Sequence, residues 1–164
     1  RLLIMKKISI LFFLIVSCFS NQNYNDIVEK SFDSDEFDVY VDKFYRDVNN
    51  YGFYPIKPEK IIIKFSYFDR IKHSTHLHGV SLGYNDNDLI EIYINKSSWD
   101  ALDRAGKFRL MYHELGHDVL NLDDLDETNT ELDAIMYPAF SINQKLKMDV
   151  FIENLNTMLE SYVK

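Results

Sequence analysis

The sequence contains a single cysteine, Cys18, among 164 residues. One cysteine cannot form a disulfide within the chain, and its isolation excludes a Cys-rich zinc site and a CxxC redox pair. Basic residues are also scarce, with 18 Lys and Arg against 26 Asp and Glu and a formal net charge of −8. Because nucleic-acid-binding proteins neutralise phosphates with basic surfaces, this charge predicts no nucleic-acid partner.

The sequence also lacks a hydrophobic run long enough to span a bilayer. The apolar stretch at residues 8–16 has nine residues, whereas a membrane-spanning helix needs about 20. This stretch follows Lys6 and Lys7 and precedes a polar segment, which is the pattern of an export signal. We therefore expect Met5 to be the true start and residues 1–17 to be a signal peptide, whose removal leaves 15 basic and 26 acidic residues, a net charge of −11.

The signal ends in Ile15-Val16-Ser17-Cys18, which resembles the lipobox of bacterial lipoproteins. In that family a peptidase cuts before a cysteine that is already lipidated on sulfur. The resemblance implies a lipid anchor on Cys18 that attaches the protein to a membrane. Phe19 stands where enterobacterial lipoproteins retained at the inner membrane commonly have Asp, so we expect an outer-membrane or cell-surface location. A buried free Cys18, behind a signal cut elsewhere, is the alternative.

The remaining chain divides into a short linker and one domain. Residues 18–33 are polar and Asn-rich, which predicts a flexible tether. Residues 34–164 show no internal repeat and are predicted to form a single domain. At its start, apolar residues recur three and four apart from Phe37 to Val48, which predicts an amphipathic helix beginning at Ser34 or Asp33.

Strand and helix patterns alternate in the rest of the domain. Residues 61–65 are predicted to form a strand, and residues 77–82 and 89–94 are predicted to form a hairpin. A short helix should open at Ser97 or Ser98, and longer helices are predicted at residues 104–120 and 150–162. The expected fold class is therefore α+β, with a three- to four-stranded mixed sheet packed on the 104–120 helix and with N- and C-terminal helices.

The helix predicted at residues 104–120 contains the motif His113-Glu114-Leu115-Gly116-His117. Four helical residues turn about 40° past a full circle, so both imidazoles leave from one face and can bind one Zn²⁺. Glu114 lies about 100° round the helix from His113, where its carboxylate can reach a water on the metal and act as general base. A surface helix whose two histidines and one glutamate face solvent is the alternative.

The segment after this helix strengthens the zinc interpretation. Asn121 tolerates the left-handed conformation that ends a helix and turns the chain back, and Met136 lies in an Ile-Met-Tyr-Pro sequence. With His113, Glu114, His117 and Met136, the sequence resembles the metzincin clan of zinc-dependent metallopeptidases, whose H-E-x-x-H-x-x-G-x-x-H motif precedes a Met-containing turn. The resemblance covers about residues 113–138.

The resemblance implies a zincin-like domain with one catalytic Zn²⁺ that hydrolyses peptide bonds in peptide or protein substrates. It also implies that Met136 forms an apolar floor beneath the metal without being a ligand. Tyr137 is a candidate for stabilising the oxyanion or the empty site, as a tyrosine does in some metzincins. Met136 as an ordinary core residue is the alternative.

The chain departs from the family pattern at the third ligand. The third histidine is missing, and the family's glycine falls on Leu120. Counting six residues from His117 gives Asp123, whereas counting three residues from the turn residue Asn121 gives Asp124. We favour Asp124, because the turn fixes where the chain returns toward the metal, and Asp123 is the second choice.

Other polar groups leave further possibilities open. Glu131 or Asp133 would be the third ligand if the site followed the gluzincin arrangement. Three histidines lie together at positions 73, 76 and 78. In an extended segment His76 and His78 share a face and could hold a second metal or line the cleft, although a polar strand edge is the favoured explanation.

Asp118 follows the second histidine of the motif. We expect it to face solvent or to form a hydrogen bond close to the metal-binding helix.

Two functions follow from these residues. The first is a membrane-anchored zinc metalloendopeptidase. The second is a non-catalytic zinc-binding lipoprotein that acts as a binding module in a surface or nutrient-uptake complex, since the loss of the third histidine changes charge and geometry at the metal. Glu114 favours the enzyme, because a pure binding site does not need a base.

Overall fold

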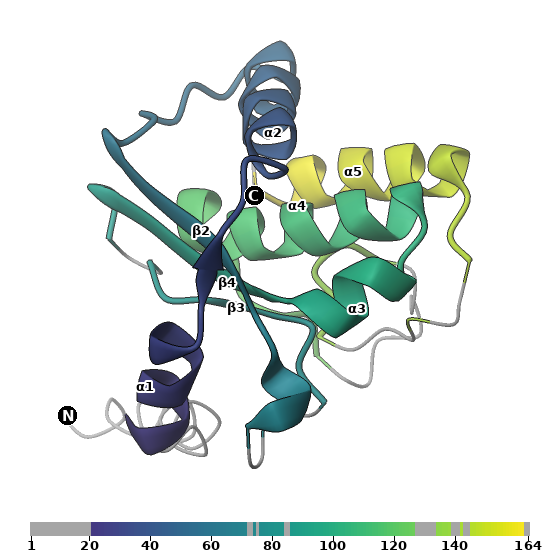
Figure 1. Cartoon of the computed structure of the whole chain (residues 1–164). Helices are drawn as coiled ribbons and strands as arrows, with labels where there is room; N and C mark the ends of the chain where they lie inside the picture. The colour runs from purple at the N-terminus through teal and green to yellow at the C-terminus, as the bar shows by residue number, and fades with distance from the viewer. Residues whose placement is uncertain are drawn as a thin grey trace, which may run out of the picture.

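The computed structural model describes residues 21–71, 74, 76–83, 86–126, 134–138, 142 and 145–162 (Figure 1). This part of the chain is an α+β domain. Its elements in chain order are α1 (Asn21–Glu29), β1 (Phe32–Asp33), α2 (Asp38–Asn50), β2 (Lys60–Ser66), the 3₁₀ helix η2 (Phe68–Arg70), β3 (Gly79–Ser81), β4 (Leu89–Asn95), α3 (Lys96–Ala101), α4 (Arg104–Leu120) and α5 (Met148–Tyr162).

The four strands form one mixed sheet in the order β1-β2-β4-β3. The central strands β2 and β4 are parallel, whereas β1 and β3 pair antiparallel to their neighbours. The predicted hairpin is therefore confirmed as β3 and β4, although β3 is shorter than the predicted strand. The prediction of a three- to four-stranded mixed sheet is also confirmed.

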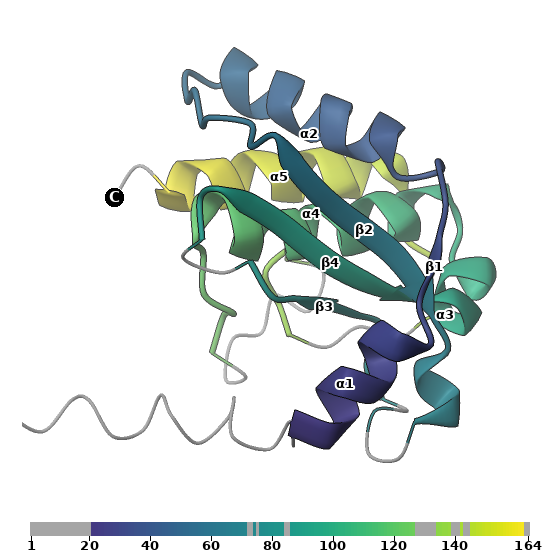
Figure 2. The ribbon, with the colours of Figure 1, turned by 60° about the vertical axis from the view of Figure 1, so that its left-hand side comes forward.

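Helices α2, α4 and α5 cover one face of the sheet, and α1 lies on the other (Figure 2). Side chains of β4 alternate between these faces: Ile90, Ile92 and Ile94 join the main core with the three helices, while Tyr93 packs with Ile27 of α1. The alternation follows from the two-residue period of a strand. Both faces of the central strand are therefore buried.

Helix α4 has the bounds that the sequence predicts. Its N-terminus is capped by Asp103, whose side chain accepts a hydrogen bond from the Gly106 N–H at 2.8 Å. Its C-terminus is capped by Asn121, which has the left-handed backbone angles φ 51° and ψ 39°. The turn predicted at Asn121 is thus confirmed.

The structure differs from the predicted tether at residues 18–33. From residue 21 onward this segment forms α1 and β1. Apolar packing explains the difference, because Ile27 is buried in a second small core with Phe68 and Ile71. Residue 18 itself lies outside the described residues.

Two predicted helix starts also need correction. Helix α2 begins at Asp38 after Phe37, with no side-chain cap, rather than at Ser34 or Asp33. Helix α3 is capped by Asn95, whose side chain accepts from the Ser97 N–H at 3.2 Å, so the cap lies before both predicted serines. Among the described residues, no helix combines the length and apolar character needed to span a membrane.

Candidate metal centre

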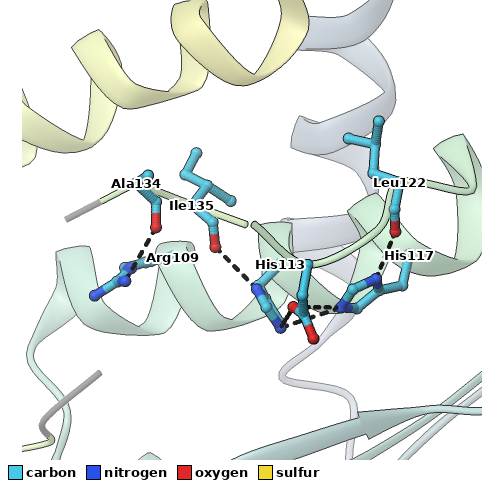
Figure 3. Close-up of polar contacts among 7 residues, drawn as sticks. Arg109, His113, His117, Leu122, Ala134 and Ile135 are labelled. Carbon is cyan, nitrogen blue, oxygen red and sulfur yellow. Dashed lines mark hydrogen bonds and ion pairs between the residues drawn. The ribbon is translucent and has the colours of Figure 1, made fainter. Parts of the chain in front are cut away.

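Helix α4 directs two imidazoles toward each other from one face (Figure 3). The Nε2 atoms of His113 and His117 lie 3.2 Å apart. Their side chains are only 13% and 18% exposed. This excludes the alternative of a surface helix whose histidines merely face solvent.

Main-chain carbonyls fix the orientation of both imidazoles. The Nδ1 atom of His113 lies 2.9 Å from the Ile135 carbonyl oxygen, and Nδ1 of His117 lies 2.6 Å from the Leu122 carbonyl oxygen (Figure 3). A carbonyl can only accept, so each Nδ1 carries the hydrogen and donates it. In the neutral form of each ring, Nε2 is then the nitrogen whose lone pair can bind a metal ion.

Asp124 completes the group. Its Oδ1 atom lies 3.5 Å from Nε2 of His113 and 3.3 Å from Nε2 of His117. The three side chains could together hold a metal ion. The structure therefore brings the favoured acid, Asp124, to the two histidines, whereas Asp123 is not part of this group.

The spacing of the three atoms permits a test of the fit. Ligands held about 2.0–2.1 Å from a tetrahedral ion such as Zn²⁺ are about 3.3–3.4 Å from one another, by the geometry of a tetrahedron. The observed separations of 3.2, 3.3 and 3.5 Å agree with this value. Three protein ligands would leave one position open, as in catalytic zinc sites.

The left-handed turn after α4 places the third ligand. The N–H groups of Asn121 and Leu122 both donate to the Gly116 carbonyl, the second at 3.0 Å. The turn brings the Leu122 carbonyl back over His117, and Asp124 follows two residues later. Asp124, three residues after Asn121, is therefore the acid that lies beside the histidines, and Asp123, six residues after His117, is not.

Met136 packs directly against the helix between the two histidines. It is buried, and a Cβ atom added to Gly116 would lie only 2.7 Å from its Sδ. The Leu125 N–H donates to the Met136 carbonyl at 2.8 Å, which joins the two segments that follow the helix. Met136 is therefore a buried side chain packed on the helix that carries both histidines.

For Tyr137, no contact in the described residues supports a role in stabilising the oxyanion or the empty site. Its backbone N–H donates to the Ala134 carbonyl at 3.2 Å, and its side chain is half-buried. Within the described ranges, nothing places its hydroxyl beside the metal-binding group. Glu131 and Asp133, the other possible ligands, lie outside the described residues.

Glu114 is buried between α4 and the edge strand β3. Its side chain is 4% exposed, and it accepts a hydrogen bond from the backbone N–H of Ser81. A Cβ atom on Gly79 would overlap with its Oε1. Burial raises the pKa of Glu114 to about 8, with the neighbouring carboxylates of Asp124 and Asp118 contributing to the rise.

Burial and neighbouring charges shift the pKa values of His113, His117 and Asp124. Burial lowers the pKa of His113, and the charge of His117 adds to this effect. Burial also opposes the charge on His117, but the hydrogen bond with Asp124 and the charge of Glu114 outweigh it and raise the pKa of His117 to about 8. Partial burial likewise disfavours the charged form of Asp124, yet its contact with His117 lowers its pKa.

Asp118 does not face solvent, in contrast to one of the two expectations for it. Its side chain is 2% exposed, and Oδ2 accepts from the Ser81 hydroxyl at 3.0 Å and from the Glu91 N–H at 3.2 Å. Burial raises its pKa. It therefore connects helix α4, which carries both histidines, with the β3–β4 hairpin.

The histidine cluster is not gathered into a second metal site in the described part of the chain. Nδ1 of His78 lies 2.9 Å from the hydroxyl of the buried Ser98, and His76 is exposed. Position 73 lies outside the described residues. Among the described residues, the one group of side chains that could hold a metal ion is His113, His117 and Asp124.

Sequence reasoning missed the groups that support the ligands. Arg109 is buried one turn before His113 and donates from its guanidinium to the Ala134 carbonyl at 3.0 Å (Figure 3). This bond holds the segment that carries the Ile135 carbonyl. The sequence signal for this role was an arginine, Arg109, on the side of α4 that is buried.

No protein-family model matches this chain, and no curated protein or solved structure matches it. A functional conclusion therefore depends on the site's own geometry.

Proposed function

We propose that this protein is a zinc-dependent metallopeptidase that hydrolyses peptide bonds and is anchored to a membrane through a lipid on Cys18. The observation that carries the proposal is the convergence of His113, His117 and Asp124, whose ligand atoms are 3.2–3.5 Å apart. A buried carboxylate, Glu114, lies one residue after the first of them.

The donor set favours Zn²⁺. Two imidazoles and one carboxylate, with one position left open, are the ligands of a well-known class of catalytic zinc sites. The same donors also suit Fe²⁺ in some oxygenases, so metal content is an essential measurement. When bound, Zn²⁺ supplies a Lewis acid that polarises a carbonyl and acidifies water.

Glu114 supplies the base. A general base must lie within hydrogen-bond reach of the water that it deprotonates, and the buried carboxylate of Glu114 directly follows the first ligand, His113, on α4. Its carboxylate takes a proton from the attacking water and can pass it to the leaving amine. The hydrogen bond from the Ser81 N–H orients the carboxylate for both transfers.

Strand β3 provides a surface for an extended substrate. It is the outermost strand of the described sheet, with β4 on one side, and it lies beside Glu114. A peptide can add to such an edge through main-chain hydrogen bonds. This arrangement would hold a scissile bond close to Glu114 and the metal-binding group.

Metal analysis combined with a cleavage assay tests the proposed function. The purified protein should contain one zinc ion per chain and cleave members of a mixed peptide library, and a chelator should abolish cleavage. Zinc without any cleavage would favour the binding module of a surface or nutrient-uptake complex. Iron in place of zinc would contradict the proposal.

Lipidation is tested separately through Cys18. Replacing Cys18 with Ser removes the sulfur to which the lipid would be attached, so the variant should leave the membrane fraction or accumulate as an uncleaved precursor. Labelling with a fatty-acid probe and fractionation of inner and outer membranes measure both effects. A Cys18→Ser protein that still takes up the probe and remains with membranes would refute the lipid anchor.

A further inference from the structure

Strand β3 is held against helix α4 by two carboxylates. Glu114 and Asp118 are four residues apart on α4, so their side chains lie on the same face of the helix. A Cβ atom on Gly79 would overlap with Glu114, and a Cβ atom on Gly83 would overlap with both carboxylate oxygens of Asp118. The strand segment therefore has a glycine at each end where it meets a carboxylate of the helix.

Ser81 is bound by both carboxylates. Its backbone N–H donates to Glu114, and its hydroxyl donates to Oδ2 of Asp118 at 3.0 Å. Asp118 also accepts from the Glu91 N–H of β4 at 3.2 Å and from the backbone N–H of Gly83. One buried carboxylate thus connects α4 to both strands of the hairpin.

We propose that Asp118 is a positioning residue that fixes the edge strand β3 beside Glu114 for substrate binding. This inference rests on the proposed peptidase function. The Asp118 carboxylate accepts three hydrogen bonds from one hairpin, so it joins α4 to the hairpin at three donors. Its own side chain belongs to the hydrogen-bond network of the hairpin and not to the metal-binding group.

Loss of the Asp118 carboxylate should affect KM more than kcat. Removing the acceptor loosens the strand on which the substrate pairs, whereas Glu114 and the histidines remain on α4. Positioning errors far from the reacting atoms can cost up to about a hundredfold. For Asp118→Ala we expect the KM for peptides to rise about tenfold or more, while kcat and zinc content stay within about threefold of the parent.

Two further variants separate positioning from stability. Asp118→Asn retains one acceptor oxygen for these donors and should raise KM less than Asp118→Ala does. Ser81→Ala removes one donor at a distance from the ligands and should raise KM in the same direction as Asp118→Ala, by a smaller factor. Because the two groups share a hydrogen bond, their effects on KM should not add in the double variant.

The measurements are the steady-state kinetics of each full-length variant, with rates divided by the amount of folded, zinc-loaded protein from calorimetry and metal analysis. An unchanged KM in Asp118→Ala and Ser81→Ala, with only a lower Tm, would mean that Asp118 has a structural role alone. Fully additive effects would also overturn the proposal. A parent protein without peptidase activity is a different result, since it would overturn the proposed function and this inference with it.

Discussion

Replacing Glu114 with Gln is expected to slow peptide hydrolysis at least about a hundredfold without removing the metal. General-base assistance is typically worth 10²- to 10⁴-fold, or about 3–5 kcal/mol of the barrier. Gln is close in size and its side-chain carbonyl can still accept from the Ser81 N–H, so the contact between α4 and β3 should persist. The amide cannot take a proton from water, and turnover should therefore fall while substrate and zinc binding stay nearly constant.

The measurement is kcat on a cleavable peptide from the library, with zinc content determined on the same preparation. Glu153→Gln is the matched control, because Glu153 is an exposed carboxylate on α5. It should behave as the parent. Equal activity of Glu114→Gln and the parent would show that Glu114 is not the base and that any hydrolysis arises at another site or from a contaminant.

Removal of either histidine should cause the largest loss of zinc. Each of His113→Ala and His117→Ala deletes one of three ligands and leaves a partly buried gap. Mutation of the groups that support a ligand commonly costs 10–100-fold in affinity, so loss of a ligand itself should lower affinity by more than about a hundredfold. The affinity is measured by competition with a chromogenic chelator at constant pH.

Asp124 and Asp123 form a matched pair for the third position. Asp124→Ala should weaken zinc binding much more than Asp123→Ala, because Oδ1 of Asp124 lies within 3.5 Å of both imidazoles. The comparison controls for the loss of one negative charge in the same loop. Undiminished zinc binding by a chain that lacks both acids would exclude the short-turn ligand and direct attention to Glu131 or Asp133.

Local patterns allowed much of the candidate metal centre to be predicted. The spacing of His113 and His117 fixes a common helix face whatever the rest of the fold is, and the helix carrying them has the predicted bounds. Asn121 adopts the left-handed angles that its side chain tolerates, which sets the return of Asp124. These inferences succeed because each depends on residues close together in the chain.

Long-range packing explains what the sequence could not show. The polar composition before residue 34 predicts a tether, but burial of Ile27 against Phe68 stabilises a helix there. The contacts of Glu114 and Asp118 with β3 join residues more than thirty positions apart, such as Ser81 and Asp118. Periodicity identifies that each segment is a helix or strand, but it does not identify which polar groups meet.

The hydrogen bonds that orient the two imidazoles end on main-chain oxygens, those of Leu122 and Ile135. Every amino acid has this carbonyl, so the orientation of the rings does not depend on the side chains at positions 122 and 135. Many substitutions there should preserve the ring orientation, provided that the backbone follows the same path. Distant homologues could therefore retain this candidate metal centre while differing at both positions, and a search for them should weigh the turn geometry above the identity of these two residues.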